Sequence, residues 1–203
     1  MTRLFLLRHG ETDWNRENRL QGHLDQPLNS LGMSQAHAAA KWMSRVDVDY
    51  ILSSDLMRAR QTAVACSEAL NLPLTLDESL RERNLGRWQG MTKSEVTARW
   101  GEQNGEIVPE GEDRHVFRRR AMDACRRLVM LAPQQTILAV THGGVIAEVV
   151  KEVLGLPAGM PRRFHVANGS FTLLEFHEDI WKLVFLNAGP ELSSPSRDVD
   201  ATL

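Results

Sequence analysis

A chain of 203 residues with 42% hydrophobic and 25% charged residues has the composition of a globular protein and is long enough to bury a core. Its formal net charge of −2 provides no overall positive field, which argues against nucleic acid or an anionic membrane surface as its partner. Two cysteines without a CxxC spacing indicate neither a disulfide framework nor a zinc site, and no apolar run has the length of a signal peptide or a membrane span, so we expect a cytoplasmic protein.

Three short apolar runs predict buried strands. They are Leu4–Leu7, Tyr50–Leu52 and Ile137–Val140, and each is nearly continuous, as in strands that are covered on both faces of a parallel sheet. We expect one domain over residues 1–192, followed by a polar tail over residues 193–203.

Four segments repeat apolar residues at helical spacing. The first follows Ser30 and places Met33 on its apolar face, and the second follows Asp55; Ser30 and Asp55 are the expected N-caps. Residues 117–131 and 145–154 flank the third strand, and the last helix is expected to end at Gly155. This alternation predicts an α/β fold, a three-layer sandwich in which helices flank a mostly parallel central sheet.

Two further segments complete the predicted domain. Ser170–Phe176 and Trp181–Leu186 flank a short turn and predict a hairpin that adds edge strands and makes the sheet mixed. Gly101–Asp113 is rich in Gly, Glu and Pro and has no clear period, so it predicts a surface excursion that could cover a site.

Polar residues directly follow each of the three predicted strands. Arg8 and His9 follow the first, Arg58 lies just after the second, and His142 follows the third. Because ligands of open α/β sheets collect beyond the carboxyl ends of the strands, these side chains are expected to converge there. Guanidinium groups match phosphate oxygens, and imidazole can attack phosphorus or donate a hydrogen bond, so the set suits a phosphoryl group without any metal.

Four sequence blocks together resemble the histidine phosphatase superfamily, which includes the cofactor-dependent phosphoglycerate mutases. The blocks are Leu7–Thr12 with Trp14 and Asn15, Ser53–Ala59 with Gln61–Ala63, Leu80–Arg83 with Gly86 and Gly90, and Thr141–Gly144. An Arg-His-Gly triplet alone recurs by chance. Four blocks in the family's order, each at a strand end or a nearby loop, are specific and span most of the chain.

The resemblance implies a role for each residue. His9 would attack the phosphorus, while Arg8, Arg58 and His142 hold the phosphoryl oxygens. Glu82 resembles the carboxylate that protonates the leaving oxygen and then activates water against the phosphohistidine. The expected substrate-binding residues are Asn15, Gln21, Gly22 and Gly143.

The chemistry sets its own requirements on these residues. His9 must be neutral at the attacking nitrogen, with the other nitrogen held by an acceptor such as a backbone carbonyl. Glu82 must start the cycle protonated, so we expect activity to be highest on the acidic side of neutrality. The glycines after His142 open a predicted helix, and its free backbone N–H groups could face the anion.

Structural interpretations compete with these roles. Glu82 lies between Arg81 and Arg83, where a solvated ion pair is an alternative, and Glu11 beside His9 is a second candidate acid that only the family pattern sets aside. His142 could instead cap the following helix.

Basic runs elsewhere in the chain have acidic neighbours and predict solvated faces, although one of them could touch an acidic substrate. These runs are Arg118–Arg120, Arg126-Arg127 and Arg162-Arg163.

The stretch after Gly90 favours the phosphatase branch of the family. It runs briefly to Pro109–Asp113, which is similar to the Pro-x-Gly-Glu-Ser stretch of that branch with Asp113 in place of the hydroxyl residue, whereas mutases carry a longer basic segment. We expect a metal-independent phosphomonoesterase, without a cofactor, that acts on a small phosphorylated metabolite as a monomer or homodimer. A cofactor-dependent phosphoglycerate mutase and a phospholigand-binding module without turnover are the alternatives.

Overall fold

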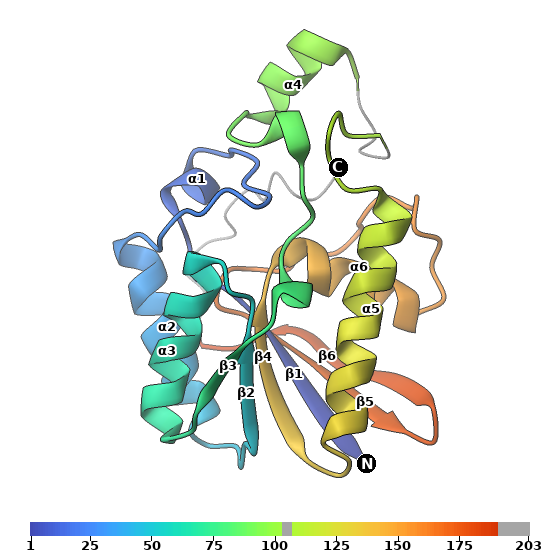
Figure 1. Cartoon of the computed structure of the whole chain (residues 1–203). Coiled ribbons are helices and arrows are strands. Elements are labelled where there is room, and N and C mark those ends of the chain that lie inside the picture. Colours follow the sequence, from blue (N-terminus) through green and yellow to red (C-terminus); the bar gives the residue numbers. More distant parts are fainter. Residues whose placement is uncertain (103–106, 191–203) are drawn as a thin grey trace.

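A computed structural model describes residues 1–102 and 107–190 (Figure 1). Its centre is a six-stranded sheet in the order β3-β2-β4-β1-β5-β6. The strands are β1 (Thr2–Arg8), β2 (Tyr50–Ser53), β3 (Leu74–Leu76), β4 (Thr136–Thr141), β5 (Phe171–His177) and β6 (Ile180–Ala188). The pairs among β1 to β4 are parallel, whereas β5 pairs antiparallel with β1 and β6 pairs antiparallel with β5. The sheet is therefore mixed, as expected.

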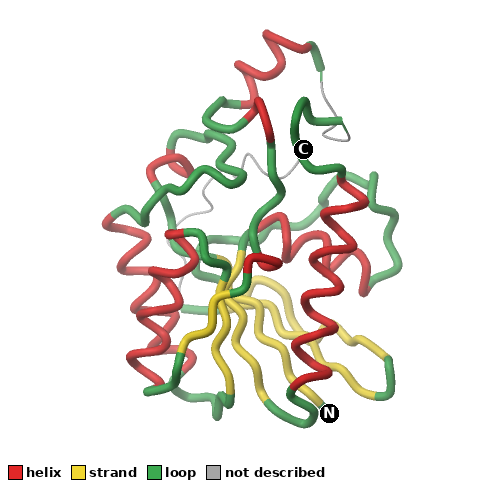
Figure 2. Tube along the Cα trace, viewed as in Figure 1, coloured by secondary structure: helices red, strands yellow, loops and turns green. Residues whose placement is uncertain are grey.

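Helices cover both faces of the sheet, as Figures 1 and 2 show. The four long ones are α2 (Ser30–Met43), α3 (Met57–Leu70), α5 (Arg114–Leu131) and α6 (Gly143–Val153). In β1, Leu4 and Leu6 belong to the core that α5 and α6 cover, while Phe5 and Leu7 belong to the core under α2 and α3. This alternation of buried residues is what a strand between two helical layers requires. The predicted three-layer α/β sandwich is confirmed.

A smaller layer lies beyond the carboxyl ends of the parallel strands. It contains α1 (Asp13–Arg16), the 3-10 turn Gly86–Trp88 and α4 (Lys93–Trp100), and a third apolar cluster around Trp88 joins this turn to α4. The predicted excursion at 101–113 belongs here, and its residues 103–106 lie outside the described part. Val108 is buried in the third cluster, and Asp113 caps α5 by accepting from the backbone N–H of His115 at 2.8 Å. Val108 is therefore packed rather than free surface, whereas Asp113 is exposed and fixed by its capping bonds.

The predicted helix starts need correction. Asn29, not Ser30, caps α2 through a bond from the backbone N–H of Gly32, and Leu56 precedes α3 without a side-chain cap. Asp55 instead accepts a hydrogen bond from Arg81 Nε at 2.8 Å. Met33 is 38% exposed, because Gly32 takes the inward position of that turn and lets α2 approach the backbone around Glu11 closely.

The C-terminal hairpin also differs in part from the prediction. Of the two hairpin strands, only β6 lies at an edge of the sheet, since β5 is inserted between β1 and β6. The turn consists of Glu178 and Asp179, both with positive φ, as in tight two-residue hairpin turns. The predicted tail at 193–203 lies outside the described residues. Among the described helices, none combines the length and the apolar character needed to cross a membrane.

Candidate active site

The ends of β1 and β4 lie side by side and bring two histidines together. Arg8 pairs in register with Thr141, so His9 and His142 follow at adjacent positions, and their ring centroids are 5.2 Å apart. Both side chains are almost inaccessible, with exposed fractions of 3% and 0%. The convergence expected from the strand ends is thus present for this pair.

His9 is fixed in one orientation. Its Nδ1 lies 2.6 Å from the carbonyl oxygen of Gly10, so Nδ1 carries the proton and Nε2 keeps its lone pair. The Gly10 carbonyl also accepts from Asn168 Nδ2 at 3.3 Å, and the Gly10 N–H donates to Thr62 Oγ1 at 3.1 Å. The acceptor that the chemistry requires is therefore a backbone carbonyl, held from two other elements.

The two predicted arginines are buried and held by backbone carbonyls. Arg58, in the first turn of α3, donates to the carbonyls of Leu24 at 3.0 Å and Gly22 at 2.8 Å. Arg8 Nη1 donates to the carbonyl of Val166 at 2.5 Å. These bonds set the direction of each guanidinium without neutralising its charge.

Burial and these arginines keep both histidines neutral. The pKa values of His9 and His142 are lowered well below the ordinary value of 6.5, first because burial disfavours the charged imidazolium and next because Arg58 repels it. A neutral imidazole at His9 is the form that can attack phosphorus.

His142 lies at the start of α6 but forms no capping bond with its side chain, so the capping interpretation is wrong. Its Nε2 lies 2.9 Å from Ser54 Oγ, and this hydroxyl also accepts from the backbone N–H of Leu56 at 3.3 Å. The hydroxyl proton is then free to point at Nε2, which places the imidazole proton on Nδ1. Nδ1 is buried and has no hydrogen-bond partner among the described residues. This N–H is suited to an incoming oxyanion.

Glu82 lies in the same cavity as His9. Its Oε1 accepts from the backbone N–H of Arg83 at 2.8 Å, and its Oε2 accepts from that of Gly144 at 2.9 Å. A solvated ion pair with Arg81 is therefore wrong, since Arg81 turns to Asp55. The expected free N–H groups at the start of α6 also need correction, because Glu82 occupies the one at Gly144. A Cβ atom at position 144 would lie 2.1 Å from Glu82 Oε1, so this contact needs glycine.

The other candidate acid lies elsewhere. Glu11 Oε1 accepts from Asn29 Nδ2 at 2.9 Å, and Glu11 does not line the cavity of His9. This difference in position now separates the two carboxylates.

The cavity beside His9 has a volume of about 130 Å³. Of the expected residues, His9, Arg58, Glu82, Gln21 and Gly22 line it. Arg8, His142 and Gly143 do not line it. They lie close to residues that do, since the ring of His142 is 5.2 Å from that of His9 and a Cβ at Gly143, next to Gly144, would lie 3.3 Å from the Arg8 guanidinium. Asn15 is not a lining residue either: its side chain accepts from the backbone N–H of Thr12 and closes a capping box on α1.

Three other lining residues were not expected from the sequence, and a fourth, Arg162, belongs to a basic run that could touch an acidic substrate. Arg114, Glu148, Lys151 and Arg162 line the cavity, and each is less than 9% exposed. The interpretation of the basic runs as solvated is therefore wrong for Arg162 and also for Arg118, which is 7% exposed. A cation in the first turn of a helix opposes the helix dipole. A cation at this position therefore indicates a nearby anion. Arg58 has such a position in α3, and Arg114 has it as the first residue of α5.

The described residues contain no group of three or more His, Cys, Asp and Glu side chains arranged to hold a metal ion. The charged side chains that line the cavity beside His9 are mostly cationic, with six Arg and Lys residues and two carboxylates. Their chemistry therefore suits an anionic ligand.

The lowered pKa of His9 predicts the acid side of the pH–rate profile. A lowered pKa means that more acid is needed to protonate His9, so a reaction step that needs neutral His9 should be lost only well below pH 6.5. We expect kcat/KM for an aryl phosphate, which reports the free enzyme, not to fall between about pH 8 and pH 6.5. A loss of activity centred at or above pH 6.5 would contradict a neutral, buried His9.

Three comparisons place this site among known proteins. The chain matches the family model of the histidine phosphatase superfamily (branch 1) over residues 4–189. It is 35% identical over 192 residues to a protein named probable phosphoglycerate mutase from Yersinia pestis (strain Pestoides F). The aligned region covers 89% of this chain and 88% of the relative.

Solved structures of phosphatases are also similar. The mycobacterial glucosyl-3-phosphoglycerate phosphatase, in a complex with VO3, superposes with a TM-score of 0.83 and 34% identity over 92% of this chain and 99% of that chain. A putative alpha-ribazole-5′-P phosphatase from Escherichia coli K-12 superposes with a TM-score of 0.83 and 28% identity over 92% and 96%.

Proposed function

The chain belongs to the histidine phosphatase superfamily, and on this premise we propose that it is a metal-independent phosphomonoesterase that acts on small phosphorylated metabolites through a phosphohistidine at His9. The observation that carries this proposal is the bond between His9 Nδ1 and the Gly10 carbonyl at 2.6 Å. It leaves Nε2 as the nucleophile, in a cavity that also contains Glu82.

The proposed reaction has two steps. In the first, the lone pair of His9 Nε2 attacks the phosphorus, the ester P–O bond breaks, and the leaving oxygen takes the proton of Glu82. In the second, Glu82 takes a proton from water, the hydroxide attacks the phosphorus, and the P–N bond breaks to release phosphate. Arg8, Arg58 and His142 stabilise the charge on the transferred oxygens, which is the main contribution a protein makes to phosphoryl transfer.

The proposed substrate-binding residues fall into two groups by position. Gln21 and Gly22 line the cavity, and Gln21 Oε1 is buried without a hydrogen-bond partner among the described residues, so it is suited to a hydroxyl donor of the substrate. Gly143 lies against Arg8, where a side chain would press on the guanidinium. Asn15 would act through the loop that follows His9, because its side chain fixes Thr12.

Solved relatives that are named as phosphatases support hydrolysis as the overall reaction. A phosphoglycerate mutase is the second candidate, favoured by the name of the Yersinia relative. A phospholigand-binding module without turnover is the third, and the retained pair of His9 and Glu82 speaks against it. A mutase would need a bisphosphate primer and would convert 3-phosphoglycerate to its isomer, whereas a phosphatase would release free phosphate.

We also propose that residues 1–192 form one domain and that the protein acts in the cytoplasm as a monomer or homodimer. Limited proteolysis, localisation of a tagged chain and light scattering would test these three statements.

The first test is phosphate release from a panel of phosphomonoesters in the presence of EDTA. We expect release that EDTA does not change, because the proposed steps use only side chains and water. Loss of activity in EDTA that a divalent cation restores would refute metal independence. No release from any ester, together with isomerisation of 3-phosphoglycerate after addition of a primer, would establish the mutase instead.

A further inference from the structure

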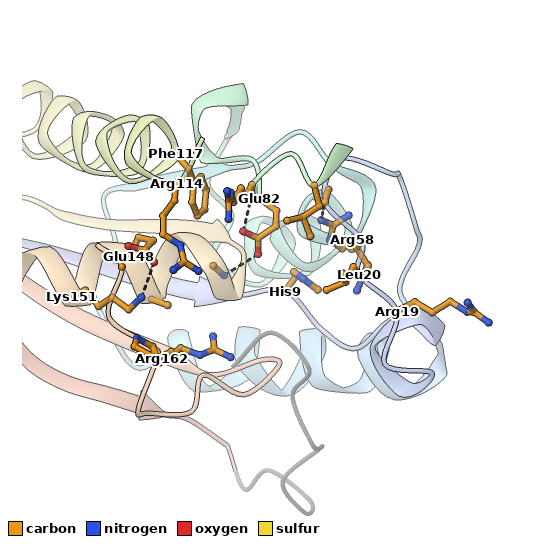
Figure 3. A pocket seen from close by; sticks show the side chains of 18 residues that line it. His9, Arg19, Leu20, Arg58, Glu82, Arg114, Phe117, Glu148, Lys151 and Arg162 are labelled. Atoms are coloured by element: carbon orange, nitrogen blue, oxygen red, sulfur yellow. Dashed lines mark hydrogen bonds and ion pairs between the residues drawn. The ribbon is translucent and has the colours of Figure 1, made fainter. Parts of the chain in front are cut away.

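The cavity has two halves that differ in their chemistry. His9, Arg58 and Glu82 form the catalytic half, while Arg114, Glu148, Lys151 and Arg162 line the rest. In the view of Figure 3, the labelled residues of this second set lie on the other side of His9 from Arg58 and Leu20. Here we call Arg114, Lys151 and Arg162 the distal cations.

The distal cations come from three separate elements. Arg114 is the first residue of α5, Lys151 lies near the end of α6, and Arg162 belongs to the loop between α6 and β5. They are 7%, 3% and 8% exposed. Long charged side chains are usually found in solvent, so three of them buried around one cavity indicate a built site.

The carboxylate among them does not balance their charge. Glu148 Oε1 pairs with Lys151 Nζ at 2.8 Å, and its Oε2 lies 3.9 Å from Arg118 Nε. Arg118 in turn pairs with Glu152 at 2.8 Å. Over the whole cavity, the lining residues include six Arg and Lys side chains but only two carboxylates, Glu82 and Glu148.

Among the distal cations, Arg114 is the one whose positive charge is least compensated. Its guanidinium has no hydrogen bond or ion pair with any residue in the described ranges, and its place in the first turn of α5 opposes the helix dipole. The cations also disfavour one another. Burial lowers the pKa of Lys151, and burial together with the neighbouring Arg114 lowers the pKa of Arg83, which lines the same cavity. An oxyanion between these groups would relieve this repulsion.

Arg162 connects the two halves of the cavity. Its Nη1 lies 3.5 Å from the carbonyl oxygen of Gly143, the residue that follows His142. The distal cations are thus part of the same continuous cavity as His9 and not a separate surface patch.

We propose that the distal cations bind a second oxyanion of the substrate, so that the natural substrate is a phosphomonoester that also carries a carboxylate. This inference rests on the proposed phosphatase function, and it narrows the substrate class. The phosphoryl group to be cleaved lies at His9, and the second anion lies toward Arg114. Neutral alcohol phosphates lack the second contact and are the poorer substrates.

Two pairs of esters test the proposal, since each pair differs mainly by one carboxylate. They are 3-phosphoglycerate against glycerol 3-phosphate, and 6-phosphogluconate against glucitol 6-phosphate. We expect kcat/KM to favour the carboxylate in at least one pair by about 10-fold or more, the value of one charge-assisted contact. Arg114→Met, which keeps an apolar stem, should remove this preference mainly through KM. It should lower kcat/KM for the carboxylate member of a pair more than for the neutral member, because the phosphoryl contacts do not involve Arg114.

Arg119→Met is the matched control, since Arg119 is exposed on the same helix and does not line the cavity. This variant should leave kcat/KM unchanged for both members of each ester pair. A wild-type enzyme without preference in either pair would overturn the proposal. So would an equal loss on both members in Arg114→Met, which would show that Arg114 only supports the fold.

Binding separates this proposal from the proposed function. Calorimetric titration of His9→Ala with the same four esters measures affinity without turnover. Tighter binding of a carboxylate ester that Arg114→Met abolishes supports the distal site even if the wild type hydrolyses nothing. Hydrolysis by the wild type without such a difference supports the phosphatase but overturns the distal site.

Discussion

Replacing His9 with alanine is expected to lower kcat/KM for phosphate esters by at least about 10⁴-fold, as loss of a covalent nucleophile does in other enzymes. Under the proposed mechanism the change removes the group that forms the P–N bond, while the fold around it should survive because the Gly10 loop keeps its bonds to Thr62 and Asn168. Initial rates of phosphate release with an aryl phosphate measure the effect, and a radiolabelled ester should no longer label the protein.

His37→Ala is the control for this variant, because His37 is exposed on α2 and only bonds to the carbonyl of Met33. It should retain wild-type activity. If His9→Ala kept more than about a tenth of the wild-type rate, covalent catalysis at His9 would be refuted.

Replacing Glu82 with glutamine is expected to lower kcat/KM for alkyl phosphates by about 10²- to 10⁴-fold, the usual contribution of a general acid. Glutamine has the same size but cannot give or take the proton. An aryl phosphate has a good leaving group and needs less help in the first step, whereas the second step still needs a base. The variant should therefore accumulate phosphorylated His9, which rapid quench of a labelled reaction under alkaline conditions would detect.

Glu11→Gln provides the matched comparison. Glu11 is next to His9 in the chain but bonds to Asn29 and does not line the cavity, so its variant should stay within a few-fold of the wild type. A large loss in Glu11→Gln together with an active Glu82→Gln would reverse the assignment of the acid.

The elements of the fold that could be predicted from the sequence are those with strong patterns of apolar residues. The runs at Leu4, Tyr50 and Ile137 are covered by helices on both faces, so they are continuously apolar and easy to recognise. Strand β3 has three residues, two of them exposed, and α4 has one fully buried residue, so neither carries a period. The position of β5 inside the sheet depends on pairing with β1 across some 170 residues of chain, which local patterns do not encode.

The same distinction holds for the site. Arg8, His9, Arg58 and His142 follow strands, and parallel strands bring their carboxyl ends to one edge, so sequence placed them together. Asn168 and Arg162 lie in the irregular stretch between α6 and β5, where no period fixes the direction of a side chain. Their positions follow only from how that loop packs over the sheet.

The position of β1 between β4 and β5 has a consequence for folding of the chain during its synthesis on the ribosome (Figure 1). Strand β1 cannot complete its pairing until residues 136–141 and 171–177 have been made. The Gly10 carbonyl, which orients His9, also receives its hydrogen bond from Asn168 only after residue 168 has been made. A nascent chain therefore contains His9 long before residues 136–177 complete the structure around it, and contacts of this long range make folding slow. Chains that stop short should be inactive and expose an apolar strand to the quality-control machinery.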